Sequence, residues 1–182
     1  SEVVGRISAQ VDTLVLEHID PALGHFGMFE CIDDPAVAKA LIDTAEAWLR
    51  AEGMQRAQGP YSISIWDEPG LLVDGFDKPP TVMMGHHLPY YKALIEASGY
   101  VGVKDLYTYE LDVTRSFPDI VQRIVSSGEK NKRISVRKVD KSRFAEEAAL
   151  ILDILNDAWT GNWGFVPLTP LEVKHVGKKL KP

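Results

Sequence analysis

Cysteine is scarce in this chain, and long apolar runs are absent. The 182 residues include a single cysteine, Cys31, which cannot form a disulfide within the chain. A protein without disulfides suits a reducing compartment, so we expect a cytoplasmic location. No run of about 18 apolar residues is present, which argues against a membrane span. Residues 1–6 lack the basic end and apolar stretch of a signal peptide, and we expect no membrane partner.

Positive charge is also in short supply. The chain has 20 Lys and Arg against 26 Asp and Glu, which gives a formal net charge of −6 and a pI near 5.4. Binding of phosphate backbones needs a surplus of Lys and Arg, so nucleic acid is not an expected partner. The five histidines are scattered. Even His86 and His87 point to opposite sides of an extended backbone, so we expect no metal site.

Several hydrolase and nucleotide motifs are missing as well. The chain has no Gly-x-Ser-x-Gly, no His-Glu-x-x-His and no Walker loop. An unrelated hydrolase is therefore the least favoured class of function.

Strand patterns dominate the start of the chain. Residues 3–12 alternate apolar and polar side chains and predict a half-buried strand, which residues 13–16 extend. Residues 24–27 break this pattern with two glycines. Residues 28–32 predict a second, short buried strand.

A capped helix follows. Asp34 supplies an N-cap, Pro35 suits the first helical position, and a 3.6-residue period runs to a stop at Gly53. Residues 54–58 predict the next strand. A strand–helix–strand unit has parallel strands, so we expect residues 28–32 and 54–58 to be parallel neighbours. The side chains expected on the sheet-facing side of the helix end are Trp48 and Leu49.

The rest of the chain is less regular. Residues 61–89 form a long loop rich in proline and glycine, which is typical of a functional segment. A helix ending at Gly99 and two strands are predicted at residues 90–98, 106–111 and 134–137. Residues 115–133 are polar and bridge two units, and a second strong helix is predicted from Phe144 to Trp159. The second unit has too few elements for a core, so we expect it to be incomplete or to pack on the first.

This order of elements resembles that of GNAT acyltransferases from their third strand onward. The closer resemblance is to bacterial proteins of unassigned function with two tandem GNAT-like domains. The blocks that carry it are Gly27-Met28-Phe29-Glu30-Cys31, Asp33-Asp34-Pro35, Trp48-Leu49-Arg50, Gly70-Leu71-Leu72-Val73, Gly75-Phe76-Asp77, Pro79-Pro80, Pro89-Tyr90-Tyr91, Gly99-Tyr100, Lys104-Asp105-Leu106-Tyr107, Asn156, Ala158-Trp159, Asn162-Trp163-Gly164-Phe165 and Pro167.

The resemblance implies an α/β (α+β) fold with a mixed, partly parallel sheet and helices on both faces. It places a GNAT-like domain without its first strand and helices at residues 1–113, a connecting segment at 114–133 and the start of a second such domain at 134–182. It also implies N-acyl transfer from acetyl-CoA or another acyl-CoA to a small-molecule or amine substrate. The alternative is a non-catalytic binding or assembly module on the same scaffold, and an oligomer is compatible with either.

The resemblance assigns acyl-CoA to the second predicted strand and the following helix N-terminus. The main-chain groups at these positions belong to Phe29, Cys31, Ile32, Ala36 and Val37. The family has a glycine-rich phosphate loop here, whereas this chain has Asp33, Asp34 and Pro35. Two carboxylates repel a pyrophosphate and proline removes a donor, so a purely structural helix cap is favoured. We therefore expect the first domain to bind acyl-CoA weakly or not at all.

Other candidate residues lie further along the chain. The family's usual acid position is Ile95 here. Tyr90 and Tyr91 lie about one turn earlier, and Tyr91 is a catalytic candidate only if the helix is shifted, so packing of Tyr90 or Tyr91 into the core is favoured. Glu68 or Asp67 would serve as a base, and Ser62 and Ser64 would bind substrate. The alternative is that all four are simply solvent-facing polar residues of a surface loop. Residues expected to line a pocket are Trp163 and Phe165, and residues expected in the core are Trp159 and Cys31.

Overall fold

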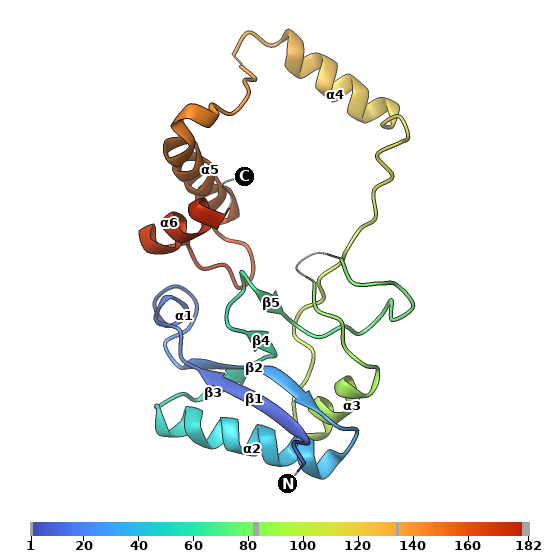
Figure 1. Cartoon of the computed structure of the whole chain (residues 1–182), viewed down its shortest axis with the longest axis vertical. Helices are drawn as coiled ribbons and strands as arrows, with labels where there is room; N and C mark the ends of the chain where they lie inside the picture. The colour runs from blue at the N-terminus through green and yellow to red at the C-terminus, as the bar shows by residue number, and fades with distance from the viewer. Residues whose placement is uncertain (1, 82–83, 134, 180–182) are drawn as a thin grey trace. The chain divides into compact units, whose positions relative to one another are not determined.

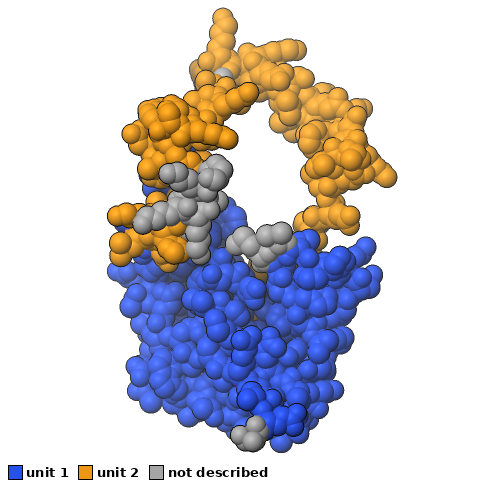
Figure 2. Space-filling view, viewed as in Figure 1, with its two compact units in different colours: residues 1–101, 153–170 blue, residues 102–152, 171–182 orange. Residues whose placement is uncertain are grey.

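The structure is a computed structural model that describes residues 2–81, 84–133 and 135–179. The chain divides into two compact units (Figure 2). Residues 1–101 and 153–170 form the first unit, and residues 102–152 and 171–182 form the second. The sheets and the candidate site described below belong to the first unit.

A small mixed sheet organises the first unit. Its strands, in spatial order, are β1 (Gly5–Gln10), β2 (Leu23–Cys31) and β3 (Arg56–Gln58). β1 runs antiparallel to β2, and β3 runs parallel to it. The predicted mixed, partly parallel sheet is confirmed. The parallel pairing joins Leu23–His25 to β3, so the prediction that residues 28–32 pair there was wrong in register.

The register error has a physical origin in how β2 is built. Gly24 and Gly27 were expected to interrupt the chain, yet both lie inside this nine-residue strand. A β-carbon on Gly24 would lie 2.4 Å from Leu49 Cδ2, and one on Gly27 would lie 1.6 Å from the carbonyl oxygen of Tyr61. Both glycines therefore permit close packing against the strand rather than a turn.

A β-bulge divides β2 into two halves. Arg6 pairs with Glu30 and Ser8 pairs with Gly27, so two residues of β2, Met28 and Phe29, oppose one residue of β1. Met28 has a φ of 45°, which is uncommon for a residue other than glycine. Because side chains alternate with a period of two, the extra residue moves Phe29 to the face that Phe26 occupies and leaves Met28 partly exposed.

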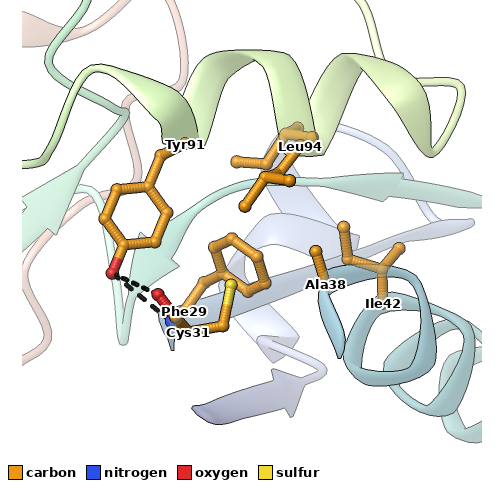
Figure 3. Close-up of a cluster of buried hydrophobic side chains, with 7 residues drawn as sticks. Phe29, Cys31, Ala38, Ile42, Tyr91 and Leu94 are labelled. Atoms are coloured by element: carbon orange, nitrogen blue, oxygen red, sulfur yellow. Dashed lines mark hydrogen bonds between the residues drawn. The ribbon is translucent and has the colours of Figure 1, made fainter. Parts of the chain in front are cut away.

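The main core lies on the Phe29 face. The helix α2 (Pro35–Ala51) and the helix α3 (Tyr90–Ala97) both contribute to it. Figure 3 shows the α3 side chains above those of β2 and α2 in this cluster, whose buried members are Phe29, Cys31, Ala38, Ile42, Tyr91, Leu94 and Ile95. The predicted helices and the predicted burial of Cys31 and Tyr91 are confirmed. Leu49 is buried on the sheet-facing side of α2, as predicted. Trp48 lies beside the row of buried α2 side chains and is 43% exposed, so the prediction that it packs on the sheet was wrong.

The opposite face of β2 carries a smaller core. Residues 13–16, predicted as strand, lie in the helix α1 (Thr13–His18), because the Asp12 carboxylate accepts the N–H of Leu14 as an N-cap. Val15 of α1 packs with Leu23 and Val166. The strands β4 (Tyr61–Ser62) and β5 (Glu68–Pro69) form a separate antiparallel pair. Figure 1 shows these elements around the three-stranded sheet.

An aromatic group extends this smaller core. The Trp66 ring stacks on Trp159 at a centroid distance of 5.7 Å and meets the edge of Phe165, also at 5.7 Å. The Trp66 Nε1–H donates to the carbonyl of Val166 at 3.0 Å. Trp159 remains 46% exposed, so the prediction of a core tryptophan was wrong, whereas Phe165 is buried. The stacking covers only one face of the Trp159 ring.

The second unit is helical. It contains α4 (Asp119–Lys130), the 3₁₀ turn η1 (Lys141–Arg143) and most of α6 (Pro170–Lys179), and α5 (Phe144–Trp159) contributes to both units. Residues 106–111 and 135–137 form no strand, and Ile134 lies outside the described residues. A strand needs a hydrogen-bonded neighbour, and none lies beside either segment in the described part of the chain. The domain boundaries drawn from the family resemblance remain predictions.

Substitution of the capping residue tests the N-cap of α2 directly. The Asp34 carboxylate accepts the N–H of Ala36 at 2.8 Å, whereas the adjacent Asp33 is exposed and makes no such bond. Loss of a capping carboxylate costs about 0.5–2 kcal/mol. Asp34→Ala should therefore lower the free energy of unfolding in urea by that amount, and the matched Asp33→Ala should change it little. Equal effects of the two substitutions would contradict the cap.

Candidate functional site

A cleft lies where the β2 bulge meets the long loop of the first unit. Its volume is about 390 Å³, and nine residues line it: Arg6, Met28, Phe29, Glu30, Pro60, Ser62, Asp67, Glu68 and His87. They come from β1, β2, β4, β5, the residues just before β4 and β5, and the loop before α3. The cleft therefore brings together residues that are up to about 80 positions apart in the sequence, from Arg6 to His87.

The bulge and β4 are held together by polar contacts. The N–H of Met28 donates to Ser62 Oγ at 3.3 Å. The Gln10 side-chain amide donates to the carbonyls of Tyr61 and Ile63 at 2.8 and 3.0 Å. Met28 and Ile63 are the non-glycine residues with positive φ in the described chain. Such conformations persist where the surroundings fix them and are frequent at functional sites.

The cleft has an excess of negative charge. Its carboxylates are Glu30, Asp67 and Glu68, and Arg6 is its single permanent cation, which gives a formal charge of 1 − 3 = −2 with the histidine neutral. Arg6 is already paired with Glu30 at 3.3 Å. The Ser64 hydroxyl donates to Asp67 at 2.7 Å and fixes that carboxylate. The arrangement favours a cationic ligand over an anionic one.

His87 lies in the cleft in a defined tautomer. Its Nδ1 accepts the N–H of Leu72 at 3.1 Å, so the proton of the neutral ring lies on Nε2. Its ring meets the edge of Tyr91 at 6.0 Å. Burial lowers the pKa of His87 below 6.5, opposed by the carboxylates of Glu68 and Glu30. At pH 7 His87 is therefore a neutral hydrogen-bond donor through Nε2.

Some of the predicted site residues lie close together in the structure. Phe29, Ser62, Asp67 and Glu68 line the cleft, and Ser64 supports Asp67 from outside. Sequence reasoning missed Arg6 and Glu30, whose pairing across β1 and β2 depends on the bulge register, and it considered His87 only as a metal ligand. The one sequence signal for His87 was its position in the long irregular loop.

Two aromatic candidates lie outside both described cavities. Trp163 is 41% exposed, and Phe165 is buried against Trp66. The loop that carries them is closed by Asn156, whose side chain accepts the N–H and donates to the carbonyl of Leu168 at 2.9 and 3.1 Å.

Tyr91 is in the core rather than in the cleft. Its hydroxyl lies 3.3 Å from both the N–H and the carbonyl of Cys31, as the dashed lines of Figure 3 mark. Burial raises the pKa of Tyr91 to about 12. The Tyr90 hydroxyl donates to the same carbonyl at 2.9 Å. The main-chain groups of Cys31 thus already have partners.

The remaining candidates for binding acyl-CoA lie next to the cap of α2. The N–H of Ile32 donates to the carbonyl of Val4 at 3.0 Å. The N–H of Ala36 is held by the Asp34 carboxylate. Val37 packs against the main core. The N–H groups of Ile32 and Ala36 and the side chain of Val37 thus already make contacts within the first unit.

A second, much smaller cavity lies beside β2. It has a volume of about 20 Å³, enough for one water molecule, and His25 and Tyr61 line it. Their rings stack at 4.5 Å, nearly parallel. Burial lowers the pKa of His25 and raises that of Tyr61 to about 12. Both groups are neutral at pH 7, and the cavity is too small for a substrate.

The described residues contain neither a metal-binding group of side chains nor a membrane-spanning helix. No group of three or more His, Cys, Asp or Glu side chains there is arranged to hold a metal ion. Among the helices of the same residues, none combines the length and apolar character needed to cross a bilayer.

The environment of His87 predicts a specific titration. Glu68 is the leading charge that raises the pKa of this histidine, so Glu68→Gln should lower that pKa further. Glu52→Gln, on the exposed end of α2, is the matched control and should leave it unchanged. NMR titration of the histidine ring protons measures both values. A pKa of His87 above 6.5, or one insensitive to Glu68→Gln, would contradict this description of the cleft.

Two curated proteins are similar to nearly the whole chain. A protein named bacterial ceramide synthase, from Caulobacter vibrioides (strain NA1000 / CB15N), is 46% identical over 179 residues, which cover 98% of this chain and 46% of that protein. Protein YghO of Escherichia coli (strain K12) is 42% identical over 181 residues, which cover 99% of this chain and 46% of that protein. No protein-family profile matches the chain. No solved structure matches it. The chain thus spans about half the length of the curated relatives it matches.

Proposed function

We propose that this chain supplies the amine-binding site of an enzyme that joins an acyl group to a long-chain amine. The observation that carries the proposal is the cleft at the β2 bulge, where three carboxylates face one paired arginine. The similarity to a protein named ceramide synthase supports it, because a ceramide is an amide of a fatty acid with a long-chain amino alcohol.

The chemistry of amide formation matches the composition of the cleft. A primary alkylamine, with a pKa of about 10.4, is an ammonium ion at neutral pH and has no free electron pair. Asp67 and Glu68 would attract that ion, and the apolar side chains of Met28 and Phe29 border the same cleft. The amine has to lose a proton before it attacks an acyl carbon.

Glu68 is the proposed proton acceptor. Asp67 is held by Ser64 and Glu30 is paired with Arg6, whereas Glu68 has no ion-pair partner among the described residues. The ammonium ion first loses one proton to solvent and becomes a neutral amine. As the C–N bond forms and the bond from the acyl carbon to its leaving group breaks, the second proton on the nitrogen passes to the Glu68 carboxylate and then to the leaving group. The Nε2–H of His87 would donate to the carbonyl oxygen as negative charge develops there.

We also propose a GNAT-type scaffold for the first unit. Support comes from the capped helix α2 between the parallel strands β2 and β3, and from α3 on the same core. Hydrogen bonding between β2 and β3 ends at His25 and Gln58, after which β2 continues past its bulge paired with β1 and no longer with β3. A ligand-binding gap between two such strands is the feature that the resemblance predicts.

The start of α2 does not fit the pyrophosphate of acyl-CoA. Asp34 occupies the N–H of Ala36, Pro35 has no N–H, and Asp33 adds a second negative charge. Tyrosine hydroxyls occupy the main-chain groups of Cys31. We therefore propose no role for this chain's first unit in holding acyl-CoA, in line with the expectation from the sequence.

A chimera tests the proposed function. This chain would replace the matching segment of the Caulobacter protein, and mass spectrometry would quantify ceramide formation. Glu68→Gln should lower kcat by about 100-fold or more, the range for loss of a general base. Asp67→Asn should mainly raise the KM for the amine, and Glu52→Gln should change neither constant.

The results of the chimera experiment distinguish a catalytic role of the chain from a purely binding role. An active chimera with unchanged kcat in Glu68→Gln would contradict the role of the cleft. A folded chimera that binds the long-chain amine but makes no amide would favour the non-catalytic binding module.

A further inference from the structure

The helix α4 in the second unit has an apolar face that no described residue of the chain covers. Ile120, Val121, Ile124 and Val125 occupy one side of this 12-residue helix. Ile120, Ile124 and Val125 are 61%, 66% and 51% exposed, and α4 has no buried residue. Adjacent exposed apolar side chains on one helix face are typical of surfaces that bind another molecule or a membrane.

The segment around α4 is basic, although the chain as a whole is acidic. Residues 113–139, here called the basic segment, contain seven Lys and Arg and two Asp and Glu, a net charge of 7 − 2 = +5. The remaining residues therefore carry −6 − 5 = −11. Arg115 and Arg137 are paired with Asp112 and Glu147. The other five cations are Arg123, Lys130, Lys132, Arg133 and Lys138.

The apolar face and the basic side chains lie next to each other on α4. At 100° per residue, the four apolar side chains cover an arc of about 140°, and Arg123 and Lys130 lie together beyond one edge of it. A helix of this type lies flat in a membrane interface, with its apolar face among the acyl chains and its cations at the headgroups. Each basic side chain adds to the attraction toward anionic lipid.

Exposed tyrosines precede the basic segment. Tyr107 and Tyr109 are 77% and 85% exposed, and their rings lie 6.5 Å apart. Tyrosine suits the interface because its ring is apolar and its hydroxyl is polar. Tyrosines beside an apolar face and a group of cations match the composition of interfacial membrane segments, which favours a lipid surface.

We infer that the basic segment binds the surface of anionic phospholipid bilayers, with α4 lying in the interface. This inference does not rest on the proposed function. The absence of a spanning helix among the described residues does not oppose it, because interfacial binding requires none.

Vesicle flotation of the chain tests the inference. We expect binding to vesicles of phosphatidylcholine and phosphatidylglycerol at 3:1, and weak binding to phosphatidylcholine alone. Ile124→Glu should reduce the partition coefficient by roughly 10-fold or more, since it places a charge in the apolar face. Ser126→Glu makes the same charge change on the polar face and should reduce it by roughly 3-fold or less. High salt should also weaken binding.

The two variants distinguish lipid binding from misfolding and from self-association. Since α4 has no buried residue, both should keep the far-ultraviolet circular dichroism and tryptophan emission of the parent chain. No binding to anionic vesicles, or equal losses in the two variants, would overturn the inference. Self-association that Ile124→Glu abolishes, without vesicle binding, would overturn it too and would assign the apolar face to a second copy of the chain.

Discussion

The first unit depends on one irregularity, the bulge that places Met28 and Phe29 opposite a single residue of β1. Without the extra residue, the alternation of β2 would direct Met28 toward α2 and Phe29 toward solvent. The bulge instead buries Phe29 under Tyr91 and leaves Met28 at the cleft. The packing of the core and the lining of the cleft therefore have the same origin.

The electrostatics of the cleft follow from the same geometry. The bulge register sets Arg6 beside Glu30, and that ion pair uses the only arginine among the lining residues. Glu68 arrives on β5, which pairs with β4. β4 is in turn held by the Met28 N–H and by Gln10. The position of Glu68 is thus set by strand pairing together with the side-chain hydrogen bonds of Gln10 and Ser62.

Local signals in the sequence predicted part of this structure. The cap at Asp34, the period of α2 and the helix before Gly99 specify their elements through nearby residues alone. The continuous strand β2 was missed because its glycines admit Leu49 and Tyr61, contacts that lie about 25 and 34 residues away in the chain. The predicted strand at residues 106–111 has a suitable pattern, but a pattern without a neighbouring strand does not make a sheet. Glu68 and Ser62 were identified from their position after a predicted strand, whereas Arg6, Glu30 and His87 join them only through the bulge and the loop.

The most direct measurement of the central claim is an NMR titration of the ¹⁵N-labelled chain with dodecylamine, using dodecanol as the uncharged control. If the cleft is an amine site, the largest amide shifts will occur at Met28, Ser62 and Glu68 with the amine and will be much smaller with the alcohol. Equal shifts with both compounds, or amine shifts located away from these residues, would contradict the account.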